Sequence, residues 1–350
     1  MDRVKIGLVG SGFAAALHME AYKQVYGIEP WVAAVASPSE RAGDFAREYG
    51  IPSVYRCMEE MIRKERPDVV DICSPPSLHA PMIGSAMGAG CHVICEKPLT
   101  GWFGDSAEPD MAKKVMEQLE QLRRVVERSG RKFFYAENFI YAPAVQKSAS
   151  LIRAAGEHIL FMRGEESHSG SHAGHAALWS MNGGGSLIRQ GCHPLSALLY
   201  LKQLENGKGA KAVGVTADMG YIVPTLNEEE RKNIQARPKD VEDLANVILT
   251  FEDGTKALIT AGDMILGGVR NEIQVYTTGG VYQCRIAPSD QMTTYHVEDE
   301  KLSGQYFTEK VETKKGWQSI FLCEDMARGY VGELRDFLLC AAGRKGEPES

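Results

Sequence analysis

The sequence lacks the features that would place the protein in a membrane, outside the cell or on a nucleic acid. No apolar run approaches the roughly 20 residues of a membrane-spanning helix. The amino-terminal residues, with Asp2, Arg3 and Lys5 among them, lack the apolar segment of a secretory signal peptide. The formal net charge is −7, whereas nucleic acids and anionic membranes attract clustered lysine and arginine. We therefore expect a cytoplasmic protein with no nucleic-acid or membrane partner.

The eight cysteines include no Cys-x-x-Cys pair, and several lie within apolar, strand-like runs. This pattern predicts reduced core cysteines rather than a disulfide framework. The chain has 350 residues, of which 44% are hydrophobic, so it is long enough for two domains that each have a core.

The first expected strand, residues 4–9, runs directly into a turn that opens a helix. The turn has the pattern Gly-x-Gly-x-x-Ala, formed by Gly10, Gly12 and Ala15. Gly10 allows the tight turn, Gly12 lets the backbone approach a pyrophosphate, and Ala15 lets the helix pack closely on the strand. A second strand at 31–36 followed by a helix supplies the βαβ context that this motif requires. The pattern therefore predicts a parallel sheet that binds a dinucleotide.

An acidic residue is missing at the end of that second strand, where it would bind the ribose 2′-hydroxyl of NAD. Ser37 stands there instead, with Arg41 shortly after it. Ser37 can bond a hydroxyl or a phosphate, and Arg41 can reach a 2′-phosphate. The sequence therefore leaves both NAD and NADP open.

Later strands are expected to end at the same edge of the sheet, where ligands bind in folds of this kind. One of them ends in Glu96 and Lys97, so Lys97 is a candidate catalytic amine, although a surface lysine in a loop is the alternative. The strand at 132–138 brings Asn138 to this edge. The expected cofactor contacts are Gly10, Ser11, Gly12, Phe13, Ala14, Ser37, Arg41, Ser74, Pro75, His79, Glu96 and Asn138.

Three stretches in the first 100 residues, GSGFAAALH, SPPSLHAPM and GCHVICEKPL, closely resemble the Gfo/Idh/MocA family of sugar-type oxidoreductases. The resemblance continues more loosely through residues 183–193, 241–243 and 250–255. It implies a Rossmann domain, then an α/β domain with a mostly antiparallel open sheet, and a nicotinamide cofactor. It also implies that Lys97 and His193 act at the reacting hydroxyl or carbonyl.

The chain departs from that family in two places near the expected site. Many relatives have an aspartate at the position of Arg189, four residues before His193, so the usual acid is replaced by a base. On a helix the two side chains share a face, and Ser186 is a plausible cap at its start. Residues 101–109 also look like an insertion.

Residues 165–175 are rich in histidine, and metal binding has to be weighed against other roles. Glycine and serine between the histidines indicate a flexible loop, so we favour sugar-hydroxyl contacts and expect no metal. Trp179 could stack on a sugar face or lie in a core. The expected substrate contacts are His168, His172, Trp179 and Arg189.

Taken together, we expect a dinucleotide-binding domain at residues 1–130 and a domain for substrate binding and oligomerisation at residues 131–350. From about Val213 the pattern predicts a β-meander, one face of which a second copy would cover as a homodimer or homotetramer. The expected activity is hydride transfer between NAD or NADP and a secondary alcohol or ketone of a sugar, polyol or glycoside. Two alternatives stay open: a glycoside-modifying enzyme that recycles its NAD internally, and a regulator that senses nucleotide or sugar without catalysis.

Overall fold

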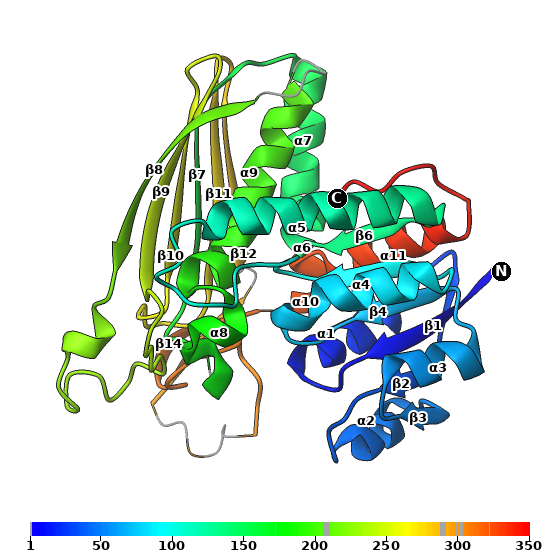
Figure 1. Cartoon of the computed structure of the whole chain (residues 1–350). Coiled ribbons are helices and arrows are strands. Elements are labelled where there is room, and N and C mark those ends of the chain that lie inside the picture. Colours follow the sequence, from blue (N-terminus) through cyan, green and yellow to red (C-terminus); the bar gives the residue numbers. More distant parts are fainter. Residues whose placement is uncertain are drawn as a thin grey trace. The chain divides into compact units, whose positions relative to one another are not determined.

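The structure is a computed structural model that describes residues 2–171, 173–205, 211–287, 292–297, 300, 304–321 and 323–350. The chain divides into two compact units, which Figure 1 shows in sequence colours. The first unit contains the residues up to 138 together with residues 329–350, and the second contains residues 139–328.

A parallel six-stranded sheet forms the centre of the first unit, in the order β3-β2-β1-β4-β5-β6. Its strands are β1 (Arg3–Val9), β2 (Glu29–Ala36), β3 (Ser53–Tyr55), β4 (Val69–Ile72), β5 (His92–Glu96) and β6 (Phe133–Ala136). The central strands are short apolar runs that are buried on both faces, as a parallel sheet between helices requires. This confirms the expected Rossmann architecture.

Helices connect these strands and supply the other side of the core. They are α1 (Phe13–Tyr22), α2 (Ala42–Tyr49), α3 (Met58–Glu65), α4 (His79–Gly88) and α5 (Met111–Ser129), joined by α11 (Tyr330–Ala341) from the end of the chain. α11 contacts α1 and β6. The first unit therefore extends beyond the expected boundary at residue 130, because β6 pairs with β5 and the apolar side of α11 is buried here.

The second unit contains a six-stranded sheet in the order β12-β11-β7-β10-β9-β8. Its strands are β7 (Ile159–Ser167), β8 (Ala212–Gly220), β9 (Leu244–Phe251), β10 (Lys256–Gly262), β11 (Arg270–Thr277) and β12 (Val281–Ala287). The expected mostly antiparallel open sheet is confirmed, with one parallel pair, β7 and β10. The expected uninterrupted meander is wrong, because β7 comes earlier in the chain yet lies between β10 and β11.

One face of this sheet carries α7 (Pro143–Ala155) and α9 (Cys192–Leu204), which contact β12, β7 and β11. Shorter elements are α6 (Asn138–Tyr141), α8 (Trp179–Asn182), α10 (Glu324–Ala327) and the hairpin strands β13 (Met292–His296) and β14 (Gly316–Ile320). In the part of the chain that the structure describes, no helix combines the length and apolar character needed to cross a membrane.

All eight cysteines are unpaired, as expected for reduced residues. Five of them are buried, but Cys57 and Cys323 are exposed, so the expectation of core positions is wrong for those two. Cys57 lies just before the first turn of α3, and Cys323 just before α10.

Candidate active site

The turn between β1 and α1 has the geometry of a phosphate-binding turn. Gly10 has φ of 106°, and an added Cβ would lie 2.4 Å from the carbonyl oxygen of Cys73. Gly12 caps α1 without a side-chain hydrogen bond, and a Cβ added there would meet no atom within 4 Å. Open space therefore lies beside the first N–H groups of a ten-residue helix, which suits the pyrophosphate of a dinucleotide.

The turn lies where the strand order reverses, between β1 and β4. In open α/β sheets this point leaves a crevice at the carboxyl ends of the strands. Ser74 and Pro75 follow β4 there, half-buried and exposed respectively. The cofactor contacts expected from β1 and β4 thus belong to one edge of one sheet.

The end of β2 supplies the expected Ser37. Its hydroxyl is mostly buried and accepts a hydrogen bond from the hydroxyl of Ser11, with the two oxygens 3.0 Å apart. Arg41 lies just before α2 and is exposed. Ser37 therefore connects the second strand to the phosphate turn, while Arg41 keeps its guanidinium toward solvent.

His79 contacts the protein backbone and not the open edge of the sheet, where a cofactor contact was expected. Its ring is fully buried, and its two nitrogens each lie 2.8 Å from a carbonyl oxygen, one of Ser74 and one of Pro98. Burial lowers the pKa of His79. The ring therefore joins the loop after β4 to the loop after β5, so its effect on a cofactor would be indirect.

The carboxyl end of β5 carries Glu96 and Lys97, as the sequence predicts. Glu96 is buried, and one of its oxygens accepts a bond from the backbone N–H of Lys97 at 3.0 Å. Lys97 is half-buried. Asn138 follows β6, the strand next to β5, and exposes only 3% of its surface. The candidate lysine and amide of the first unit therefore share the edge with the phosphate turn.

In the second unit, the three glycines at 183–185 form a turn that tolerates no side chain. Gly183 has φ of 73°, and a Cβ on Gly185 would lie 1.8 Å from the carbonyl oxygen of Glu242. The Glu242 carboxylate accepts bonds from the N–H groups of Gly185 and Leu187, at 2.8 and 2.9 Å. The expected capping role of Ser186 is wrong, because this carboxylate from a distant segment takes the first N–H groups instead.

The helix that follows starts with a π-helical turn, Leu187–Gly191, before α9 begins. Arg189 lies in this turn, and its guanidinium forms an ion pair with Asp263 just after β10. Asp263 also accepts a bond from Gln190 and lies 3.7 Å from Nδ1 of His168. Burial raises the pKa of Asp263, although Arg189 and Gln190 oppose this. An acidic side chain is therefore present beside Arg189, but it is Asp263 from a different segment of the chain.

His193 has other partners. Its ring, 4% exposed, stacks on Phe139 with centroids 4.8 Å apart, and its Nε2 lies 3.9 Å from a carboxylate oxygen of Glu166. A spacing of four residues aligns side chains only on a regular α-helix, and the π-helical turn between Arg189 and His193 interrupts that geometry. The sequence motifs did not single out Glu166, which lies near the end of β7 in a stretch expected to be a loop, or Asp263, which directly follows β10.

Arg189 and Asp263 line a pocket of about 490 Å³ in the second unit, together with Arg237 and Lys239. His168 is buried, and its Nδ1 accepts a hydrogen bond from the backbone N–H of Gly170 at 2.9 Å. His172 lies outside the described residues. The indole N–H of Trp179 is buried and has no hydrogen-bond partner among the described residues.

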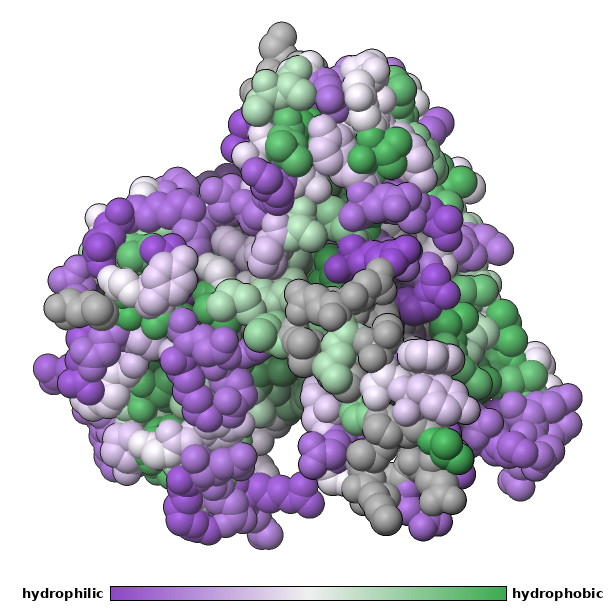
Figure 2. All heavy atoms as spheres, turned by 180° about the vertical axis from the view of Figure 1, so that it is seen from behind, coloured by the Kyte–Doolittle hydropathy of each residue, from purple (hydrophilic) through white to green (hydrophobic). Residues whose placement is uncertain are grey.

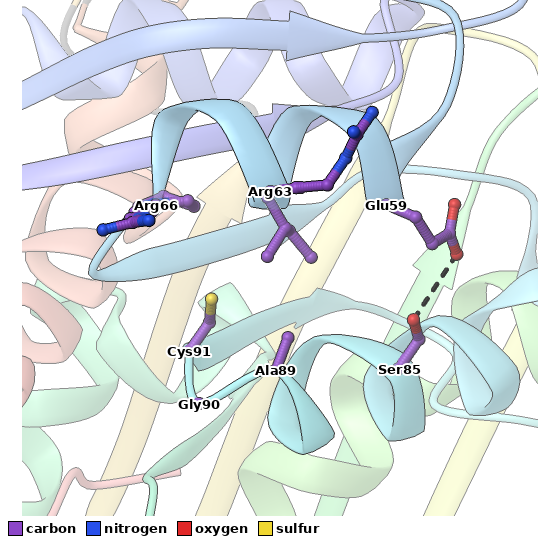
Figure 3. Close-up of a pocket in the computed structure, with 9 residues that line it drawn as sticks. Glu59, Arg63, Arg66, Ser85, Ala89, Gly90 and Cys91 are labelled. Atoms are coloured by element: carbon purple, nitrogen blue, oxygen red, sulfur yellow. Dashed lines mark hydrogen bonds between the residues drawn. The ribbon is translucent and has the colours of Figure 1, made fainter.

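A larger hollow, of about 580 Å³, lies between α3 and α4, and Figure 3 shows Glu59 and Ser85 bonded across it at 3.4 Å. Pro67 and Cys91, which precede β4 and β5, belong to its wall. The hollow is therefore at the amino edge of the sheet, away from the cofactor turn.

The strand order, the glycine turn and the polar residues at one edge together define a dinucleotide-binding fold. Two models of one family match the chain: "Oxidoreductase family, NAD-binding Rossmann fold" over residues 4–128 and "GFO/IDH/MocA C-terminal domain" over residues 158–283. Together they cover well over half of the sequence, and the chain belongs to this family of NAD-binding oxidoreductases. The expected family is thereby confirmed.

Among curated proteins, D-apiose dehydrogenase of Paraburkholderia graminis is 29% identical over 44% of this chain and 37% of its own length. D-glucoside 3-dehydrogenase of Escherichia coli is 31% identical over 35% of this chain and 33% of its own. The chain thus matches less than half the length of these two relatives. In fold, it is similar to GenD2 from gentamicin A biosynthesis in complex with NAD, with a TM-score of 0.79 and 22% identity over 100% of this chain and 90% of that one.

Proposed function

We propose that the protein is a dehydrogenase that transfers a hydride between NAD or NADP and a secondary alcohol or ketone of a sugar, polyol or glycoside. The observation that carries this proposal is Lys97, which ends a strand at the same sheet edge as the phosphate turn. The first unit would bind the cofactor, and the second would bind the substrate. The curated relatives that share the family are named as dehydrogenases of apiose and of glucosides, which supports a carbohydrate-type substrate.

The residues have distinct roles in this proposal. The nicotinamide, when bound, accepts or donates the hydride. Lys97 and His193 share the proton of the reacting hydroxyl and polarise its oxygen, which contributes about 10² to 10⁴ in rate for a positioned acid and base. Glu166, near Nε2 of His193, would orient the imidazole.

Substrate hydroxyls would bind in the pocket of the second unit. Arg189 lines this pocket and is itself held by Asp263, so its donors are pre-oriented. The buried indole N–H of Trp179 offers a donor for a ligand oxygen. The ring of His168 lies near the carboxylate of Asp263. The proposed substrate contact of His172 rests on the sequence alone.

The test is steady-state turnover of Lys97→Ala and His193→Ala on a panel of sugars, polyols and glycosides. Both variants should lose about 10² to 10⁴ in kcat/KM while still binding cofactor. Rates like those of the wild-type protein in both variants would contradict the proposed roles. NADH that stays bound through turnover, with no net release, would point instead to internal cofactor recycling.

Cofactor preference is tested by comparing kcat/KM for NAD and NADP in the wild type and in Arg41→Ala. Arg41 is the exposed cation close to the end of β2. If NADP is used, Arg41→Ala should reduce kcat/KM for NADP and leave that for NAD nearly unchanged. Equal effects on both cofactors would show that Arg41 does not bind the 2′-phosphate.

We also propose that two copies associate through the sheet of the second unit. One face of this sheet carries the β9–β10 pair Ile248 and Leu258 and the β7–β11 pair Phe161 and Tyr276, and these side chains are half-buried or exposed. Figure 2 shows hydrophobic surface on the side where β8 and β9 lie. Ile248 is 42% exposed there, and β8 is exposed along almost its whole length. An uncovered edge strand beside apolar side chains is typical of an interface.

A further inference from the structure

A cluster of buried polar side chains lies beneath the carboxyl edge of the first sheet. His18 and Tyr22 come from α1, Asp71 from β4 and Glu96 from β5. His18 and Asp71 are fully buried, and the other two expose less than a tenth of their surface. Four polar side chains meet inside an otherwise apolar core, where each must be bonded to be tolerated.

The hydrogen bonds run in one line toward the candidate catalytic lysine. Tyr22 donates its hydroxyl to Asp71 at 2.8 Å, and Nδ1 of His18 lies 2.8 Å from the same carboxylate oxygen. The other ring nitrogen, Nε2, lies 3.1 Å from one oxygen of Glu96. The second oxygen of Glu96 accepts the backbone N–H of Lys97 at 3.0 Å. Glu96 therefore bridges the imidazole to the backbone of Lys97.

We propose that His18 is a positioning residue, which orients the Glu96 carboxylate and through it the backbone of Lys97. This rests on the proposed catalytic role of Lys97. A carboxylate at the end of a strand can rotate about its own side-chain bonds, and the bond from Nε2 selects one orientation. Since a misplacement of about 1 Å at a reacting group can cost about 10² in rate, this bond affects turnover.

The charges around His18 are consistent with donation from both ring nitrogens. An ionised carboxylate only accepts hydrogen bonds, so a ring between two carboxylates is satisfied when both nitrogens carry a proton. Burial lowers the pKa of His18, but Asp71 and its hydrogen bond more than offset this, and the pKa is raised well above its ordinary value.

Other titratable groups also face His18. Burial raises the pKa of Cys73 to about 12 and that of Cys95 well above its ordinary value. Burial also raises the pKa of Glu333, which α11 brings to the cluster and whose carboxylate has no hydrogen-bond partner among the described residues. The two carboxylates to which the His18 ring is bonded are thus Asp71 and Glu96.

Two neutral variants of similar size separate the two bonds. The amide nitrogen of glutamine reaches about as far as Nε2 of histidine, and that of asparagine about as far as Nδ1. His18→Gln can therefore keep the bond to Glu96, whereas His18→Asn can keep only the bond to Asp71. Both replace the imidazole with a neutral amide, so a purely structural role of His18 predicts equal effects.

The measurement is kcat and KM for both variants, with thermal unfolding in parallel. We expect His18→Asn to lower kcat about 10- to 100-fold with KM nearly unchanged, and His18→Gln to restore most of that loss. Tyr22→Phe, which removes only the outer bond to Asp71, should lower the melting temperature and leave kcat unchanged. Equal kcat in the Asn and Gln variants would overturn the proposal.

Neutron diffraction of wild-type crystals provides a second test that needs no variant. A deuteron on Nε2 of His18, directed at Glu96, is expected, and a bare Nε2 would overturn the proposal even if the variants failed to fold. Lys97→Ala is measured alongside. If Lys97→Ala keeps full activity, the proposed function fails; if only the two His18 variants behave alike, the positioning role alone fails.

Discussion

At the scale of single residues, Arg189 and Asp263 change the meaning of a sequence motif. Arg189 stands where many relatives carry an acid, and this suggested either an altered proton path or a loss of catalysis. The structure pairs Arg189 with a buried aspartate from the end of β10. An arginine held by a carboxylate has directed donors and little net charge, so it suits hydroxyl recognition better than repulsion of a catalytic cation.

Asp263→Asn should test this pair. The change removes the anion from the half-buried Arg189, so we expect KM for the substrate to rise by about tenfold or more while cofactor binding is unchanged. Asp263→Glu is the matched control, because it keeps the negative charge. Its KM should lie between those of the wild type and Asp263→Asn. An unchanged KM in Asp263→Asn would exclude the pair from substrate binding.

At the scale of elements, one buried lysine joins the end of α9 to the sheet. Lys202 is 1% exposed, and its ammonium bonds Glu205, the carboxylate of Asp253 at 2.6 Å and the hydroxyl of Thr255 at 3.0 Å. Thr255 in turn donates to the carbonyl of Ile159 at the start of β7. The helix, the β9–β10 turn and β7 are therefore held by one cation.

Removal of that cation should be costly. Lys202→Met removes the ammonium from buried Glu205 and leaves it only the backbone N–H of Ile159 and the ring of His158, so we expect the free energy of unfolding to fall by about 3 kcal/mol. Lys147→Met, at an exposed position of α7, should change it by less than about 0.5 kcal/mol. Urea denaturation of both variants checks this, and similar midpoints would contradict it.

The same cluster predicts an acid dependence of stability. Although burial raises the pKa of Asp253, its bonds to Lys202 and Thr255 lower it to about 2, from an ordinary value of 3.8. A depressed pKa stabilises the fold above the unfolded value, and the contribution disappears as the pH falls from about 4 to about 2. Asp253→Asn should show a smaller loss of stability over this interval than the wild type; an identical pH profile would rule out this contribution.

At the scale of the whole molecule, the open face of the second sheet leads to a prediction about assembly. Ile248→Glu places a charge in the middle of the proposed interface, so we expect the mass from light scattering to fall toward that of one chain. Val54→Glu is the matched control, because Val54 on β3 has a similar exposure, 46% against 42%, and lies in the other unit. A wild-type mass for Ile248→Glu would place the interface elsewhere.

Local patterns were sufficient for the alternating strands and helices of the first unit up to β6. The strand that leads into Gly10, the alternation of strands and helices, and the proline after Lys97 are short-range signals, and each led to the observed element. The insertion of β7 between β10 and β11 was not accessible in this way, because strand pairing depends on contacts between distant segments. The same holds for α11, which returns to the first unit from the end of the chain.

The amino-acid sequence alone indicated the family through its resemblance and predicted the cofactor turn and the candidate pair Lys97 and His193, because the motifs that carry them span only a few residues each. Only the tertiary structure showed which carboxylates bond the functional side chains and cap the helix. Asp263 reaches Arg189, Glu242 caps the helix before His193, and Glu96 connects to His18 across a separation of 78 residues. Burial makes an unpaired charge costly, so each buried cation requires an anion, but only the folded chain shows which one is near enough.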